Sequence, residues 1–307
     1  MSEPAPGARP LCADTSLAAA EDLAGTASRV EAWILVEYGG LWPYEPLDAA
    51  PFAGRVRQRL EEQLAAIPRS HLLLVKKPGR GREQRIRVVL ARTPERGAAA
   101  TELELGAYSE LLELDLGAAF AGELPGRRLA HPLLLVCTHG KRDRCCARYG
   151  QPVCEALHEG APRPWLWQAS HVGGDRFAGN LVTLPEGFYF GRVTREDVPG
   201  LLAAYREGRL PLELFRGRSA YPFPVQAAEI AVRRATGLDG FWDLRFRGAE
   251  RVDEHVLRIR LDGETAGAVH EVEVAREHGE PTYLTCSAGR EMPPRRFVAR
   301  SVRSLTG

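Results

Sequence analysis

The chain has 307 residues, of which 44% are hydrophobic and 26% charged, and its 41 basic side chains nearly balance 40 acidic ones. A net charge of +1 supplies no global field that would draw the chain to nucleic acid or to an anionic membrane, so neither is expected as a partner. Because nearly all of the basic residues are arginine, in a chain rich in Ala, Gly and Pro, arginine content alone is weak evidence for phosphate binding.

The N-terminal stretch MSEPAPGARPLCADTS lacks the basic start and apolar core of a secretory signal. No run of about 18 apolar residues suggests a membrane span. We therefore expect a cytoplasmic protein. Six cysteines are too few for a disulfide scaffold. Four of them fall within residues 137–154, and in a reducing compartment such a cluster indicates metal binding or redox chemistry.

Residues 1–128 are expected to form a first domain. An apolar run at 32–40, ended by two glycines, is typical of a buried strand. Apolar side chains at helical spacing predict a helix over 52–67, which Pro68 ends. Further strands are predicted at 71–77 and 85–92, with one or two more between 103 and 116.

The same order recurs in residues 129–238. A buried strand at 131–136 leads through a polar loop into a helix over 145–158, and another strand follows at 165–170. A hairpin, a helix ending at Gly208 and a helix over about 222–236 complete the unit. This order is that of a thioredoxin-like domain. The first domain looks like a degenerate copy without cysteines at the matching loop.

The pattern changes after Gly240 to short alternating segments, FWDLRFR, HVLRIRL, HEVEVA and TYLTCS, with Asp262-Gly263 as a turn. They predict a small antiparallel β meander whose alternating Arg and Glu residues form a solvated face. The predicted fold class is therefore α/β, with tandem thioredoxin-like domains at 1–128 and 129–238 and a β-rich module at 239–307.

The candidate site lies at the ends of the strands of the second domain. Cys137 ends a buried strand, where ligands gather in open α/β sheets. Cys146 follows near a helix N-terminus, which favours a thiolate. His171 ends the next strand, and two glycines and then Asp175 follow it. Four donors around one point would match the needs of a [2Fe–2S] cluster.

Spacing alone leaves other interpretations open. A Zn²⁺ site with Cys and His ligands fits the same spacing, and buried free cysteines beside a hydrogen-bonded histidine fit it equally well. Cys-x-x-Cys is absent from the sequence, so the thioredoxin dithiol motif does not support disulfide exchange.

The segments CTHGKRDRCC, WQASHVGGDRFAGNLVTLPEGFYFGRV and RGRSAYPFPVQAAE resemble the sucrase/ferredoxin-like family, most specifically over about 131–230. The resemblance implies a thioredoxin-like ferredoxin with a [2Fe–2S] cluster on a C-x8-C loop and an H-x-G-G-H loop. Carried over to this chain, the ligands are Cys137, Cys146 and His171. The implied role is single-electron transfer by an electron carrier and not by an enzyme.

Asp175 stands where the family pattern has its second histidine. It could ligate through a carboxylate oxygen, Cys145 or Cys154 could replace it, or the cluster could be absent. We favour Asp175, with Cys145 as the alternative fourth ligand, because Cys154 should lie about two turns into the helix and point elsewhere. A charged carboxylate should lower the reduction potential relative to a centre with two neutral histidines.

Four residues are expected to surround the ligands: His139, Arg142, Gly173 and Gly174. Asp143 is expected to pair with Arg142 and fix the loop. Several basic side chains lie nearby, and they form either a solvated loop or a surface that compensates a negative cluster and docks an acidic redox partner protein. These are Lys141, Arg142, Arg144, Arg148 and Arg176.

Two competing functions remain at this point. One is a cluster-free or zinc-holding thioredoxin-like binding module. The other is a thiol-based redox protein that uses Cys145, Cys146 or Cys154. No residue pattern marks the paired carboxylates of a glycosidase, and no glycine-rich phosphate loop is visible.

Overall fold

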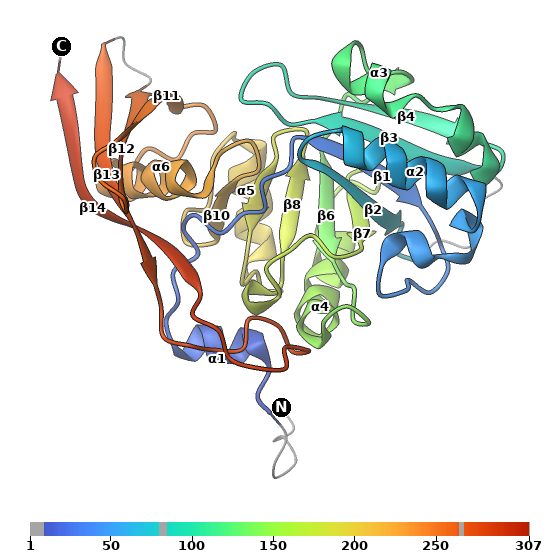
Figure 1. Cartoon of the computed structure of the whole chain (residues 1–307), viewed down its shortest axis with the longest axis horizontal. Helices are drawn as coiled ribbons and strands as arrows, with labels where there is room; N and C mark the ends of the chain where they lie inside the picture. Colours follow the sequence, from blue (N-terminus) through green and yellow to red (C-terminus); the bar gives the residue numbers. More distant parts are fainter. Residues whose placement is uncertain (1–8, 80–84, 264–266, 307) are drawn as a thin grey trace.

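The computed structural model describes residues 9–79, 85–263 and 267–306. Its body is a ten-stranded sheet with the order β10-β9-β8-β6-β7-β2-β1-β3-β4-β5 (Figure 1). The first half supplies β1 (Ala32–Glu37), β2 (Ser70–Lys76), β3 (Ile86–Arg92), β4 (Ala99–Leu105) and β5 (Arg127–Arg128). The second half supplies β6 (Leu133–Cys137), β7 (Leu166–Ala169), β8 (Leu181–Leu184), β9 (Phe188–Phe190) and β10 (Phe215–Arg218).

The two halves of the sheet repeat one topology. In the first half β1 is parallel to β2 and antiparallel to β3, which pairs antiparallel with β4. In the second half β6 is parallel to β7 and antiparallel to β8, which pairs antiparallel with β9. The corresponding strands β2 and β7 join the halves by antiparallel pairing, with Val75 opposite Ala169. The structure is thus a mixed α/β fold around one large curled sheet.

Six α-helices in the described part of the chain accompany the strands, and several of them bury the apolar side chains of the large sheet. They are α1 (Cys12–Ala18), α2 (Arg55–Ala66), α3 (Leu116–Ala121), α4 (Arg144–Gly160), α5 (Val198–Arg206) and α6 (Phe223–Thr236). α2 and α3 cover one face of the first half, and α4 and α5 cover one face of the second half. None of the helices within the described residues combines the length and the apolar character that a membrane crossing needs.

The opposite faces of the two halves share one core. Trp33 and Leu73 from the first half pack in it with Leu135 and Trp167 from the second. The rings of Trp33 and Tyr189 lie 6.1 Å apart across this junction. The sheet and this core thus include residues from both halves of the chain.

A second sheet holds the C-terminal strands β11 (Leu244–Arg251), β12 (Val256–Gly263), β13 (Ala268–His278) and β14 (Arg295–Thr306) in sequence order. Its apolar face packs on α6, which lies between the two sheets (Figure 1). Arg258 and Arg260 pair with glutamates of the neighbouring strands on the other face. This alternation of apolar and charged residues explains the predicted antiparallel strands.

Several local predictions were wrong. The last strand is β14, and the predicted strand TYLTCS lies in the connection that precedes it. The region 103–116 holds the end of β4 and a 3-10 turn (Tyr108–Glu113), and α3 begins at its last residue. Asp262 and Gly263 end β12 instead of forming a turn, and the next residues, 264–266, lie outside the described part of the chain.

Candidate metal centre

The fold brings the two predicted ligand loops together. Cys137 is the last residue of β6, and Cys146 lies in the first turn of α4. His171 is the second residue after the end of β7. The two sulfur atoms and one ring nitrogen of His171 all lie within 4.8 Å of one another. Both thiols are buried, and the side chain of His171 is 21% exposed.

Asp175 lies beside two of these three donors. Its Oδ1 atom is 3.3 Å from Cys146 Sγ and 3.0 Å from His171 Nδ1. The same Nδ1 atom is 4.0 Å from Cys146 Sγ. The structure therefore places all four predicted residues in one cluster, with Asp175 positioned either to ligate a metal or to orient the imidazole.

The glycines after His171 permit a close approach of other groups. Gly173 and Gly174 have φ of +94° and +83°, which strongly favours glycine. A Cβ on Gly173 would lie 2.3 Å from Ser28 Oγ, and one on Gly174 would lie 2.2 Å from an Arg216 guanidinium nitrogen. Asn180 Nδ2 donates to the Gly174 carbonyl at 2.8 Å and so fixes the loop.

Arg216, on β10, is a residue that the sequence analysis missed. Its guanidinium is buried and donates to the Gly173 carbonyl at 3.2 Å and to Asn180 Oδ1 at 2.7 Å. It also donates to Thr26 Oγ1 at 3.1 Å. Burial is the main cause that lowers the pKa of Arg216 to about 10, so it remains a cation at neutral pH. A buried positive charge therefore lies directly behind the His171 loop.

The site also stabilises a thiolate. The hydrogen bond between Cys137 and Cys146 is the largest cause that lowers the pKa of Cys137 well below its ordinary value. The same contact raises the pKa of the Cys146 thiol. Burial opposes charge on His171, but hydrogen bonds to Asp175 and Cys137 outweigh it and raise the pKa of His171 to about 10. These contacts favour a thiolate at Cys137 beside a protonated His171, and metal binding there would displace the protons of His171 and Cys146.

The first half of the chain covers the cysteine loop. His139 Nε2 lies 2.8 Å from the Pro43 carbonyl, and its ring packs edge-on against Trp42. Arg142 pairs with Glu45 and stacks over Tyr44. Asp143 therefore does not form the predicted pair with Arg142.

Asp143 instead caps α4. Its Oδ1 atom accepts a hydrogen bond from the Cys145 backbone N–H at 2.9 Å. Such a cap fixes the first turn of the helix and hence Cys146.

The tautomer of His139 follows from its partner. A carbonyl can only accept, so Nε2 carries the proton, and the buried Nδ1 has no hydrogen-bond partner among the described residues. Burial lowers the pKa of His139, which keeps the ring neutral. In this state Nδ1 is an acceptor and does not donate to a sulfur atom.

The two alternative cysteine ligands lie elsewhere. Cys154 packs in the core between α4 and the second half of the sheet. Cys145 Sγ lies 3.5 Å from Cys12 Sγ and 3.3 Å from Cys286 Sγ, in a second thiol group. The sequence shows the spacing of the cysteines in residues 137–154, but it gives no signal that Cys12 and Cys286 meet there.

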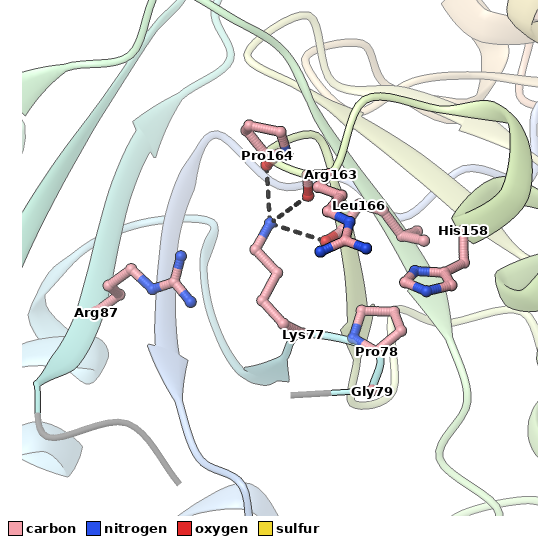
Figure 2. Close-up of a pocket in the computed structure, with 8 residues that line it drawn as sticks. All are labelled: Lys77, Pro78, Gly79, Arg87, His158, Arg163, Pro164 and Leu166. Atoms are coloured by element: carbon pink, nitrogen blue, oxygen red, sulfur yellow. Dashed lines mark hydrogen bonds between the residues drawn. The ribbon is translucent and has the colours of Figure 1, made fainter. Parts of the chain in front are cut away.

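A separate pocket lined by basic side chains lies where the two halves of the chain meet. A cavity of about 410 Å³ is lined by Lys77, Arg87, His158 and Arg163 among others (Figure 2). Lys77 Nζ donates to three backbone carbonyls of residues 163–166, and Arg87 pairs with Glu37. Lys77 thus binds backbone carbonyls of the second half, and Arg87 binds a carboxylate of the first half, which favours a packing role for these two cations over an anion site.

The donor chemistry of the first cluster fits an iron–sulfur group. Two cysteine sulfurs and an imidazole nitrogen lie within 4.8 Å of one another, and the carboxylate of Asp175 lies beside one of the sulfurs and the imidazole. Thiolates and imidazoles are the usual ligands of [2Fe–2S] centres. The buried Arg216 and the N-terminus of α4 supply positive potential beside it.

Comparisons with known proteins connect this geometry to relatives. Three similar chains are each named "Altered inheritance of mitochondria protein 32". The one from Meyerozyma guilliermondii is 30% identical over 105 residues, 31% of this chain and 37% of its own length. The one from Eremothecium gossypii is 30% identical over 119 residues, which are 33% of this chain and 37% of its own length. The one from Candida glabrata is 29% identical over 98 residues, which are 27% of this chain and 31% of its own length. The chain thus aligns with about a third of each of these relatives.

A crystal structure of a variant of the thioredoxin-like [2Fe–2S] ferredoxin from Aquifex aeolicus is also similar. It covers 29% of this chain and 100% of its own, at 20% identity and a TM-score of 0.25. The profile of the sucrase/ferredoxin-like family matches residues 23–217, which is more than half of the chain. The protein therefore belongs to the sucrase/ferredoxin-like family.

Proposed function

We propose that this protein is a [2Fe–2S] ferredoxin that transfers single electrons, with Cys137, Cys146, His171 and Asp175 as ligands. The observation that carries the proposal is the convergence of two buried thiols and an imidazole from two separate loops, within 4.8 Å of one another. When bound, the cluster would supply one-electron oxidation and reduction.

We further propose that each half of the large sheet is a thioredoxin-like domain and that the first half has lost its ligands. The repeated strand order supports this proposal. Where Cys137 ends β6, the equivalent end of β1 carries Glu37, whose carboxylate binds Arg87 at 2.8 and 3.0 Å. An ion pair thus replaces a ligand, and the first half serves as the packing partner of the cysteine loop.

The residues of this chain have definite tasks in that function. Asn180 and Arg216 hold the His171 loop through its backbone carbonyls. Asp143 fixes the start of α4 and hence Cys146. The positive charge of Arg216 would favour the reduced, more negative state of a cluster.

The partner is proposed to be a redox protein with an acidic surface, since Lys141 and Arg144 are exposed beside the cysteine loop. The proposed location is the cytoplasm. The name of the curated relatives concerns mitochondria, and the matched region covers only part of those proteins.

Single substitutions test the ligand assignment. Cys137→Ser and Cys146→Ser should each abolish the visible absorption and the bound iron and sulfide of protein purified without oxygen. Cys154→Ser is the matched control, because this buried thiol belongs to neither donor group, and it should keep the full cluster. A full cluster in either of the first two variants would refute the assignment.

A mononuclear zinc centre is the second candidate. The mutual distances below 4.8 Å suit three donors around a single ion. Metal analysis of the wild-type protein separates the two candidates. A wild-type protein without iron or sulfide, with a zinc that the Cys137→Ser and Cys146→Ser variants lose, would favour the binding-module function over electron transfer.

A further inference from the structure

A second group of thiols lies outside the proposed cluster site. The Sγ atoms of Cys12, Cys145 and Cys286 are separated by 3.5, 3.3 and 3.7 Å. Asp143 completes the group, and the four ligand atoms all lie within 4.8 Å of one another. These residues come from α1, from the start of α4 and from the connection between β13 and β14. Three chain segments that are remote in sequence therefore meet through their sulfur atoms.

The sulfur distances discriminate between possible occupants. A disulfide needs an S–S distance of about 2.05 Å, well below any of the three. Two sulfurs bound tetrahedrally to one ion at about 2.3 Å lie about 3.8 Å apart. The three observed separations, 3.3, 3.5 and 3.7 Å, lie much closer to this value than to the length of a disulfide.

We propose that Cys12, Cys145 and Cys286 bind one structural Zn²⁺ ion, with Asp143 as the fourth ligand. Thiolate and carboxylate donors at a tetrahedral point suit Zn²⁺ better than a hard cation. Binding releases the thiol protons to solvent and involves no electron transfer. The donors are closed in by the protein, since Cys12, Asp143 and Cys145 are buried.

The carboxylate of Asp143 is held in place for this role. Its Oδ1 atom accepts from the Cys145 backbone N–H at 2.9 Å, and its Oδ2 atom accepts from the Cys286 backbone N–H at 2.6 Å. Both oxygens are 3.9 Å from Cys12 Sγ. Each oxygen keeps a lone pair for a metal, and the two hydrogen bonds fix its orientation.

The path of the chain shows which segment a metal at this point would hold in place. Antiparallel neighbours such as β13 and β14 are commonly joined by about two to five residues. Here residues 279–294 leave the C-terminal sheet and run past α1 to the foot of α4 (Figure 1). Arg9 stacks over Tyr283 and donates to the Ala288 carbonyl at 2.6 Å. The apolar cluster at this point is small and has Cys12 and Cys145 at its centre, so burial alone holds the segment weakly.

The electrostatics also favour metal binding there. Cys145 lies in the first turn of α4, where the helix dipole favours an anion. A Zn²⁺ ion would neutralise the further charge of the other two thiolates and of Asp143.

The two sites share a helix end but not a ligand. Cys145 and Cys146 are adjacent, and their sulfur atoms belong to different donor groups. Zinc bound by Cys145 would fix the first turn of α4 and therefore the position of Cys146. The inference does not depend on the proposed cluster, because zinc and iron are measured separately.

The test uses the full-length wild-type protein, produced with added Zn²⁺ and dialysed against metal-free buffer. Elemental analysis should find one zinc per chain. Zinc X-ray absorption should show about three sulfur neighbours near 2.3 Å and one oxygen near 2.0 Å. An absence of zinc, a zinc with two sulfur and one or two nitrogen neighbours, or a disulfide among the three cysteines found by mass spectrometry would each overturn the proposal.

Variants assign the ion to this site. The double variant Cys12→Ser with Cys286→Ser should lose that zinc while it keeps iron and sulfide. The double variant Cys137→Ser with Cys146→Ser should do the reverse. The matched control Cys154→Ser should keep the zinc. Retention of one tightly bound zinc by the first double variant would refute the assignment, and the absorption measurement on the wild type remains decisive if that variant fails to fold.

Discussion

The packing of α4 against the end of β6 predicts a strong effect of one added methyl group. Gly150 lies in α4, and a Cβ built on it would be 2.0 Å from the Cys137 carbonyl oxygen. An ordinary contact begins at 3.4 Å, so the helix and the strand end must separate by about 1.4 Å. Cys137 and Cys146 sit on these two elements, and the shift would spread the proposed ligands.

Alanine at an open helix position stabilises a protein by up to about 1 kcal/mol relative to glycine. Overpacking of this kind costs about 1–3 kcal/mol. Gly150→Ala should therefore lower the free energy of unfolding and reduce the bound iron. Gly200→Ala in α5 is the matched control, because its Cβ would meet nothing within 4 Å, and it should keep full stability and iron content.

Urea denaturation and iron analysis of both variants measure the effect. If Gly150→Ala equals Gly200→Ala in stability and iron content, α4 does not pack on Cys137 as described.

Two further predictions concern charge. Asp175→His should keep the cluster and raise its reduction potential, since a neutral imidazole replaces a carboxylate; an unchanged potential in voltammetry would place Asp175 outside the ligand set. Glu229→Gln should lower the free energy of unfolding at pH 7 by roughly 3 kcal/mol, because it leaves the buried Arg218 and Arg233 without their counter-charge. Burial opposes charge on Glu229, but the two arginines outweigh burial and lower the pKa of Glu229 below the ordinary 4.5. The stabilisation by the Glu229 carboxylate is therefore complete above pH 4.5 and is lost as the pH falls through the lowered pKa. Denaturant titrations should find the gap between wild type and variant closing in acid, and a constant gap would contradict this account.

Apolar periodicity in the sequence predicted most of the large sheet and its helices. The run at 32–40 contains β1, and the run at 131–136 covers all of β6 except its last residue, Cys137. The helix predicted over 222–236 matches α6 within one residue. Such runs are informative because strands buried on both faces must be apolar throughout. The order of elements then limited the topologies, and so the ends of β6 and β7 were correctly placed together.

The parts that the sequence missed depend on remote partners. β10 has the sequence FRGR, which has no strand pattern, and its arginines are buried because Asn180 and Glu229 bind them. The excursion of residues 279–294 and the meeting of Cys12 with Cys286 are likewise fixed by tertiary contacts. A local sequence pattern gives no information about such contacts. A search of the sequence for clustered cysteines finds only cysteines that are close together in the chain.

The central claim is that the group formed by Cys137, Cys146, His171 and Asp175 holds a [2Fe–2S] cluster. The most direct test is an ultraviolet–visible spectrum of the wild-type protein purified without oxygen, with iron and sulfide assays on the same sample. A red-brown protein with about two iron and two sulfide per chain is the predicted result. A protein that stays colourless after attempted reconstitution with iron and sulfide would contradict the claim.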